Sequence, residues 1–394
     1  MSIDIARVRA ETRAADTVIH FNNAGASLPP RVVMDTVHEQ LRNDEVFGGY
    51  EAQALATSAL DIAHDDVARL IGGQGSSIAF FDGATRAWQA ALYSLPWKAG
   101  DRVLASEADY PSAIYAYDVL AQRYGVNVDF VPDDEHGQID VDALRDAIDD
   151  RTALISVTHV PTYGGLINPV EDVGAIAKDA GVPFLLDACQ SVGQLDIDVQ
   201  RIGCDLLTAA GRKYLRGPRG TGFLWASPNI LPDLSPLGRD QFSAAWPDPD
   251  TIKLAPGARR FELFERSVAL QLGLGAAARY ATEVGTAAIE SRVVLLGAAL
   301  RGQLDEIEGV TVRDRGQRLG GIVTFTVDGL DAAAIQVGLR ENHINTSIST
   351  ADSAQRAFPP RGLTEVVRAS VHYFNTDEEI TRTADVIKGL TESL

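Results

Sequence analysis

The sequence predicts an α/β fold: a large unit with a mostly parallel seven-stranded sheet flanked by helices, followed by a small C-terminal α+β unit. Short apolar runs alternate with segments of helical periodicity through the middle of the chain, which is typical of strand–helix–strand units. Several of these runs are apolar almost without interruption, as at residues 153–157, and such strands suit a sheet covered on both faces. The pattern changes after about Asp250.

The apolar and β-branched runs define the seven expected strands of the large sheet. They cover residues 77–81, 102–105, 128–131, 153–158, 183–187, 205–209 and 222–225. Helical periodicity occupies several of the intervals between them, at residues 84–95, 113–124, 141–148 and 171–180. A helix that joins two strands in this way returns the chain by a right-handed crossover, so we expect most of these strands to run parallel.

The C-terminal part of the chain has a different organisation. A stretch rich in Ala, Leu and Gly at residues 267–304 predicts a long interdomain helix. Strands are then expected at residues 310–313, 322–327, 344–348 and 366–372, and helices at 332–341 and from Asp377. We expect an N-terminal arm (1–20), a large domain (21–255) and a small domain (256–394), with the boundary in the Pro-, Gly- and Asp-rich stretch 228–257.

The composition excludes several classes of protein. A length of 394 residues exceeds that of one ordinary domain. The 54 acidic residues outnumber the 35 basic ones, for a net charge of −19, so we expect neither nucleic acid nor an anionic membrane as partner. Two cysteines cannot build a disulfide scaffold or a four-thiolate metal site, and we expect no metal. Without a signal-peptide pattern or an apolar run of about 20 residues, the chain is expected in the cytoplasm.

Four clusters of polar residues lie on strands or at strand ends, where open α/β sheets bind ligands. The first, Asp82-Gly83-Ala84-Thr85-Arg86, joins an expected strand to an expected helix. Its small residues leave backbone N–H groups free at the positive end of the helix, which favours an anion, and Thr85 adds a hydroxyl. A simple helix cap by Asp82 is the alternative.

The second cluster is Asp187-Ala188-Cys189-Gln190, which follows a buried strand. An acidic residue at such a position is costly unless it has a cationic partner. A protonated pyridine nitrogen is one such partner. A structural salt bridge or a helix cap is the alternative.

The third cluster contains Lys213, which follows the next strand in Gly211-Arg212-Lys213-Tyr214. A lysine in a partly desolvated pocket has a lowered pKa and can form a Schiff base with an aldehyde, and Arg212 beside it can neutralise a phosphate. A basic surface patch is the alternative. The fourth cluster centres on Arg368, an arginine among apolar residues of an expected strand. It needs an anion, which is either a substrate carboxylate or a structural ion-pair partner.

The order and spacing of these clusters are more specific than any one of them. Asp187 and Gln190 follow one strand, Lys213 follows the next, and Arg368 lies in the small domain. This arrangement resembles the fold type I enzymes that use pyridoxal 5′-phosphate, and more closely the class V aminotransferase family. That family includes cysteine desulfurases, selenocysteine lyases, C–S lyases and isopenicillin N epimerase-like proteins. The resemblance runs from Phe21 to residues 373–379.

The resemblance implies how the cofactor is held. Lys213 would bind it covalently and later act as the base at Cα of the substrate. Asp187 would pair with the pyridine nitrogen, and Gln190 would hydrogen-bond the phenolic oxygen. The other implied cofactor-binding residues are Ala84, Thr85 and Arg212 at the phosphate, Tyr110 stacked on the ring, and Thr162, where desulfurases often have Asn.

The resemblance also implies a substrate side. Arg368 would hold the α-carboxylate of an amino-acid substrate. Asn23, Ala24 and Gly25 would line the same side of the site. His159 either contacts the cofactor or is a core histidine. The active site of these relatives lies at a subunit interface, so a homodimer is expected.

The sequence departs from the family pattern in three places. Residues 347–356, where desulfurases carry a nucleophilic cysteine, contain none, which disfavours a persulfide mechanism. Cys189 and Cys204 lie elsewhere. Ala210 stands where relatives often place a hydroxyl near the phosphate, a loss that Arg212 can offset. Residues 264–265 are Phe-Glu where desulfurases have Gly-Thr, which puts a phosphate contact across the subunit interface in doubt.

These observations predict a pyridoxal-phosphate-dependent enzyme acting at Cα of an amino acid. The missing cysteine favours C–S lyase chemistry, a β-elimination from a cysteine-derived substrate. Transfer of the amino group to a 2-oxo acid and epimerisation are the alternatives. A binding protein with little turnover is disfavoured, because a degenerate site would be expected to lose its lysine. The loops at residues 47–49, 242–246 and 349–361 are expected to define the substrate side chain.

Overall fold

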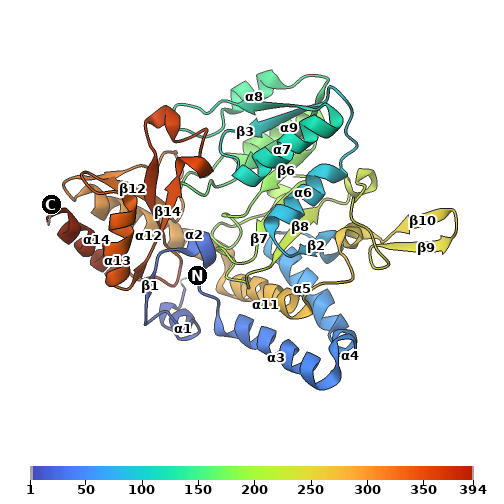
Figure 1. Ribbon diagram of the computed structural model, residues 1–394, viewed down its shortest axis with the longest axis horizontal. Helices are drawn as coiled ribbons and strands as arrows, with labels where there is room; N and C mark the ends of the chain where they lie inside the picture. The colour runs from blue at the N-terminus through green and yellow to red at the C-terminus, as the bar shows by residue number, and fades with distance from the viewer. Residues whose placement is uncertain (1–2, 393–394) are drawn as a thin grey trace.

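The computed structural model describes residues 3–392, and its largest layer is a seven-stranded sheet (Figure 1). The strands follow one another across it in the order β2-β8-β7-β6-β5-β3-β4. Their bounds are β2 Ile78–Phe81, β3 Arg102–Ser106, β4 Asn127–Val131, β5 Thr152–Thr158, β6 Phe184–Asp187, β7 Leu206–Ala210 and β8 Gly222–Ala226. All seven predicted strands are therefore confirmed, each within one residue of its predicted ends.

The large sheet is mostly parallel, as predicted. The pairs β3–β4, β3–β5, β5–β6 and β6–β7 are parallel, whereas β8 runs antiparallel to both β7 and β2. The connection from β7 to β8 contains turns and no helix. It is too short for the crossover that a parallel pair requires, so β8 returns against its neighbours.

Helices cover both faces of this sheet. One face packs α6 (Ala84–Ser94) and α7 (Pro111–Tyr124), and the other packs α8 (Val141–Ala147), α9 (Val170–Ala180) and α5 (Thr57–Leu70). Strand β3 shows the alternation, because Val103 and Ala105 join the core under α6 and α7 while Leu104 joins the opposite core. Burial on both faces accounts for the nearly continuous apolar strands.

The long helix predicted at residues 267–304 is two helices. α11 (Val268–Val284) and α12 (Thr286–Asp305) are separated at Gly285, whose φ of 97° is open to glycine and interrupts a helix. Periodicity could not reveal the break, because small and apolar residues continue across it. α11 packs against α5 and α3 (Arg31–Phe47), whereas Leu296 and Leu300 of α12 join the core of the second sheet.

The second sheet is antiparallel and has the strand order β11-β12-β15-β14. Its elements are β11 Val310–Val312, β12 Ile322–Val327, β14 Ser347–Thr350 and β15 Glu365–Ser370, with α13 Ala332–Glu341 and α14 Asp377–Thr391. The strand predicted at 344–348 is divided, because β13 (Ile344–Asn345) pairs instead with β1 (Ile19–His20). Phe21 packs in the core of this sheet. The chain start is thus tied to the second sheet, and the three-part division stays a prediction.

A hairpin that was not predicted lies in the predicted boundary stretch. Strands β9 (Ala244–Asp248) and β10 (Thr251–Leu254) project from the body of the molecule (Figure 1). Pro247 within β9 has no N–H to donate, so a strand tolerates it only at an edge position. The remaining α-helices among the described residues are α1 Ile5–Ala10, α2 Asn23–Ala26, α4 Gly49–Leu55 and α10 Val199–Ile202.

Among residues 3–392, no helix is long and apolar enough to cross a membrane. The same residues contain no group of three His, Cys, Asp or Glu side chains placed to hold a metal ion.

Candidate active site

A cavity of about 290 Å³ lies at the carboxyl ends of β5, β6 and β7. Its wall includes Ala24, Gly25, Ala84, Thr85, Tyr110, Thr162, Asp187, Gln190, Arg212, Lys213 and Arg368. All the predicted site residues except Asn23 therefore meet in one place, although they come from distant parts of the chain. The loops at residues 47–49, 242–246 and 349–361 contribute nothing to this wall as described, so their part in substrate recognition stays a prediction.

The register of the large sheet explains this convergence. Thr158 of β5 is paired with Asp187 of β6, which is paired in turn with Thr208 of β7. Carboxyl ends of parallel strands meet at the same edge of a sheet. Asp187 at the end of β6 and Lys213 just beyond β7 are consequently neighbours across the cavity.

One end of the cavity is formed by the turn before α6. The N-cap of α6 is Gly83, without a side-chain cap, so the alternative of a cap by Asp82 is wrong. The first N–H groups of α6 are thus left for an anion. Strand β8 passes close to this turn at Gly222. A Cβ at position 222 would lie 2.6 Å from the Ala84 nitrogen and clash with it, so the close approach requires glycine. Arg212 lines the same cavity and supplies positive charge.

Lys213 is buried, with 9% of its surface exposed. Burial lowers its pKa, while Cys189 and Asp187 oppose this shift and Arg212 and Arg368 reinforce it. Its Nζ lies 5.8 Å from the centre of the Tyr110 ring. A lowered pKa increases the fraction of neutral amine, which is the form that reacts with an aldehyde.

Asp187 and Gln190 fix the floor of the cavity. The Cys189 N–H donates to Asp187 Oδ1 at 2.8 Å. Gln190 Nε2 donates to the carbonyl of Ala24 at 3.0 Å and to Thr162 Oγ1 at 3.1 Å. Gln190 Oε1 is buried and accepts no hydrogen bond from residues 3–392, which leaves one acceptor for a group bound in the cavity.

Arg368 enters the cavity from β15 of the second sheet. Its Nη1 donates to the carbonyl and to Oγ1 of Thr162, each at 2.8 Å, and its Nη2 lies 3.4 Å from Asn22 Oδ1. Its Nε is buried and has no hydrogen-bond partner among the described residues. In the part of the chain that the structure describes, Arg368 has no carboxylate partner, so the alternative of a structural ion pair is wrong. Burial lowers its pKa, and an anion in the cavity would offset that cost.

Asn23 is placed differently from the prediction. Its side chain is fully buried and donates to the carbonyls of His20 and Ser370, while accepting from Ser27. It does not reach the cavity wall. Asn23 instead fastens α2 to β15, which places Ala24 and Gly25 beside Arg368.

Sequence reasoning missed several residues of the wall, among them Trp88, Thr158 and Val160. Trp88 is buried on the side of α6 that packs on the sheet, and no motif distinguished it from a core residue. Thr158 could have been found from its place at the last position of β5. His159 is buried outside the wall, and burial lowers its pKa to about 3.

Thr162 links both sides of the site, because its hydroxyl accepts from Gln190 and from Arg368. We expect Thr162→Val to leave these two buried donors poorly satisfied, at a cost of about 1–3 kcal/mol. KM for the amino-acid substrate should rise about ten-fold or more. Steady-state kinetics would measure it, with exposed Thr311→Val on β11 as control. An unchanged KM would contradict a linking role for Thr162.

Comparison with known proteins agrees with this geometry. The model of the family described as aminotransferase class-V matches residues 19–383. The chain belongs to the class V aminotransferase family. A probable cysteine desulfurase of Methanothermobacter thermautotrophicus is 30% identical over 84% of each chain. The apo cysteine desulfurase of Thermococcus onnurineus NA1 has a TM-score of 0.92 at 27% identity, with 100% of this chain and 99% of that chain covered.

A solved complex of the cystine C–S lyase C-DES with cysteine persulfide has the same fold, with a TM-score of 0.85 at 23% identity over 95% of this chain and 99% of that one. The predicted fold type I architecture is thus confirmed, and this class V enzyme depends on pyridoxal 5′-phosphate.

The cavity fits that cofactor in its chemistry. Lys213 would meet the aldehyde, and the open N-terminus of α6 together with Arg212 would meet the phosphate. Asp187 would face the pyridine nitrogen. The Gln190 Oε1, which has no partner among the described residues, would accept a hydrogen bond from the phenolic O–H. Each polar group of the cofactor therefore has a complementary group in the wall.

Proposed function

We propose that this class V enzyme is a C–S lyase that performs β-elimination on a cysteine-derived amino acid. The placement of the two cysteines carries the proposal. Cys189 lines the cofactor cavity, where burial beside Asp187 raises the pKa of its thiol well above the ordinary value. Cys204 is buried away from the cavity. A thiol held protonated is a poor nucleophile, and the segment at residues 347–356 offers no other.

The chain's own residues then divide the work. Bound pyridoxal phosphate stabilises the negative charge that develops at Cα of an amino acid. Arg368 would hold the substrate carboxylate, with Thr162 fixing the orientation of the guanidinium. Lys213, as a buried neutral amine, would take the proton from Cα. Tyr110, whose ring faces Lys213, would cover the cofactor and limit the access of water.

The product mixture tests the proposal. The holoenzyme is incubated with S-substituted cysteines, and pyruvate, ammonia and thiol are measured together. We expect the three in equal amounts. Amino transfer to an added 2-oxo acid without pyruvate would indicate an aminotransferase, and loss of optical rotation without either would indicate an epimerase. Alanine from free cysteine would point to desulfurase activity, for which several similar proteins are named. Any of these three results would replace the lyase assignment.

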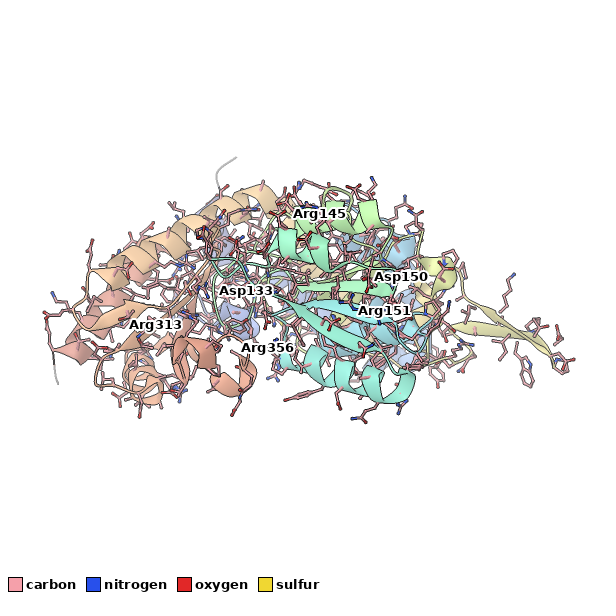
Figure 2. The ribbon with its side chains drawn as sticks, turned by 90° about the horizontal axis from the view of Figure 1, so that it is seen from above. Asp133, Arg145, Asp150, Arg151, Arg313 and Arg356 are labelled. Atoms are coloured by element: carbon pink, nitrogen blue, oxygen red, sulfur yellow. The ribbon has the colours of Figure 1, made fainter. Side chains whose placement is uncertain are left out.

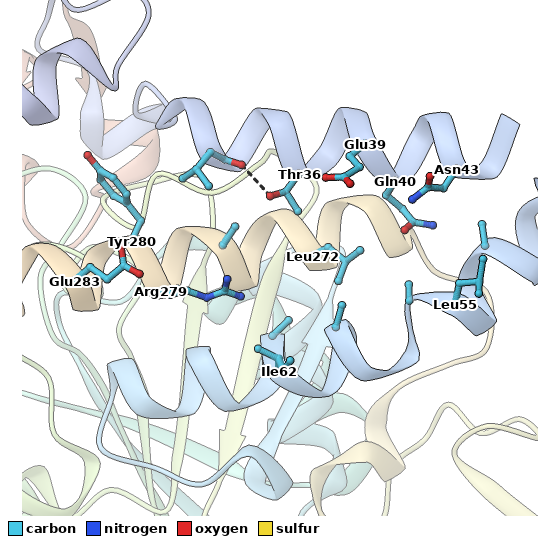
Figure 3. A pocket seen from close by; sticks show the side chains of 16 residues that line it. Thr36, Glu39, Gln40, Asn43, Leu55, Ile62, Leu272, Arg279, Tyr280 and Glu283 are labelled. Carbon is cyan, nitrogen blue, oxygen red and sulfur yellow. Dashed lines mark hydrogen bonds between the residues drawn. The ribbon is translucent and has the colours of Figure 1, made fainter. Parts of the chain in front are cut away.

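We also propose that the enzyme is a homodimer whose interface includes the α3–α4–α5 surface. This surface exposes Val46, Phe47, Tyr50 and Leu55, with Val46, Tyr50 and Leu55 each above 70% exposed. Beside it, a groove of about 540 Å³ runs between α3, α5 and α11 (Figure 3). So many exposed large apolar side chains on neighbouring helices favour burial against a second copy.

We expect light scattering to give twice the chain mass for the wild type. The double variant Val46→Glu/Leu55→Glu should be monomeric at micromolar concentration, because two charges would be desolvated in each half of the interface. Val337→Glu, on the exposed face of α13, is the matched control and should stay dimeric. A monomeric wild type would refute the dimer, and a dimeric double variant would refute this interface.

A further inference from the structure

The turn between β3 and α7 carries three side chains with different partners. Glu107 forms an ion pair with Arg356, near the seam between the two sheets (Figure 2). Tyr110, the N-cap residue of α7, points its ring at Lys213. Asp109 lies between them in the chain, is 8% exposed, and does not line the cavity. The proposed function leaves Asp109 without a role.

Asp109 is the centre of a buried network of hydroxyl groups. Its Oδ1 accepts from Ser106 at 2.7 Å and from Thr158 at 3.0 Å, and its Oδ2 accepts from Tyr117 at 2.7 Å. These partners come from β3, β5 and α7. Among the described residues no cation pairs with Asp109. A buried carboxyl group without a cation is costly, and the three hydroxyl donors only partly offset that cost.

The network reaches the proposed cofactor site by two short routes. Thr158 lines the cavity and is the register partner of Asp187. Tyr110 follows Asp109 directly, and its carbonyl accepts from the Ala113 N–H at 2.8 Å to begin α7. A displacement of Asp109 would therefore displace the turn that carries Tyr110. It would also displace the end of β5, which lies beside Asp187.

We propose that Asp109 is a positioning residue: its carboxylate fastens the turn of residues 107–110 to the end of β5 and so holds the Tyr110 ring over the cofactor and Lys213. The inference rests on the proposed placement of the cofactor in this cavity, and it holds whichever reaction the enzyme performs. Asp109 acts through Tyr110 and Thr158.

The charge on Asp109 makes this fastening depend on pH. Burial raises the pKa of Asp109 to about 6, with the three hydroxyls opposing the shift and Asp187 adding to it. Besides these groups, the Arg356 guanidinium and the Tyr163 phenol interact electrostatically with Asp109. Above this pH the carboxylate accepts three hydrogen bonds. Below it, the protonated group must donate one, and the turn is held less firmly.

The test compares cofactor affinity in wild type and Asp109→Asn between pH 5 and pH 8. Equilibrium dialysis of the holoenzyme gives the dissociation constant of pyridoxal phosphate at each pH. The phosphate ester also titrates near pH 6, so the measured quantity is the ratio of the two constants, in which that effect cancels. We expect a ratio near one at pH 5 and about ten at pH 8. A ratio independent of pH would overturn the inference.

Two further variants separate positioning from general stability. Tyr117→Phe removes one hydrogen-bond donor and thereby raises the pKa of Asp109 further. The pH at which cofactor affinity changes as Asp109 titrates, which we call the step, should therefore be higher in this variant. This variant also keeps the inference testable if Asp109→Asn does not fold. An unmoved step would contradict the network. Asp118→Asn lies at an exposed position of α7, where the Asp118 carboxylate accepts a hydrogen bond from Gln122, and it should match the wild type at every pH.

Borohydride reduction followed by peptide mass spectrometry locates the cofactor in the wild type. Cofactor fixed on Lys213 confirms the placement on which the inference rests, and a pH-independent ratio then refutes the role of Asp109 alone. Cofactor fixed elsewhere refutes the placement and the inference together.

Discussion

Replacing Lys213 by Ala should abolish covalent attachment of the cofactor and lower kcat by about 10²–10⁴-fold or more. Lys213 is the lysine in the cavity wall, and burial lowers its pKa so that the neutral amine is available both to bind the aldehyde and to take a proton. Loss of one side chain removes both roles. Absorbance spectra before and after borohydride reduction measure the attachment, and product formation measures the turnover.

Lys178→Ala is the matched control for this prediction, since Lys178 lies on the exposed face of α9. It should keep the visible absorbance of the lysine-bound cofactor and full activity. If Lys213→Ala kept that absorbance, another lysine would hold the cofactor, and the assignment of Lys213 would be wrong.

The pKa of Lys213 also gives a stability prediction with a definite sign. A lysine whose pKa is lower in the folded state binds fewer protons there than in the unfolded chain. The cofactor-free protein should therefore gain stability as pH rises from the lowered pKa towards the ordinary value of about 10.4. In Lys213→Met this gain should be absent. Urea unfolding at several pH values measures the free energy of unfolding. If this free energy changed equally with pH in the two proteins, the lowered pKa of Lys213 would be contradicted.

The large sheet was predictable because its signal is local. Each strand is a short apolar run, and burial on both faces keeps that run continuous through β5, β6 and β7. The break between α11 and α12 at Gly285 was not predictable from periodicity, because Gly is common throughout the stretch. The pairing of β1 with β13 joins residues more than three hundred positions apart, and a two-residue strand carries no local pattern.

The candidate site also contains residues whose placement could be predicted from the sequence and one whose placement could not. Asp187, Gln190 and Lys213 stand directly after strands, so register alone brings them to one edge, and their placement together followed from the sequence. The family resemblance placed Asn23 with Ala24 and Gly25 on the substrate side, yet its amide donates to the carbonyls of His20 and Ser370. The direction of a side chain in a four-residue helix depends on such long-range partners, which no spacing rule supplies.

Replacing Arg368 by Met should raise KM for the amino-acid substrate while leaving the cofactor bound. Removing one partner of a buried, hydrogen-bonded charge pair costs about 2–5 kcal/mol, so kcat/KM should fall by about 30-fold to several thousand-fold. Arg301 shows what a structural arginine looks like in this fold: it is equally buried, and it pairs with Asp314 at 2.7 Å. Within residues 3–392, Arg368 has no such carboxylate partner and its Nε has no acceptor. We therefore expect the carboxylate of the substrate to pair with this guanidinium.

Arg368→Lys distinguishes charge from geometry. Lysine keeps the positive charge but cannot donate in parallel to both oxygens of a carboxylate, and it cannot reproduce the two bonds to Thr162 in the same plane. We expect its kcat/KM to lie between those of wild type and Arg368→Met, with the absorbance of the bound cofactor unchanged in all three. Arg340→Met on the exposed end of α13 is the control. If Arg368→Met changed the cofactor spectrum but left KM unaltered, Arg368 would serve the cofactor and the carboxylate clamp would have to lie elsewhere in the wall.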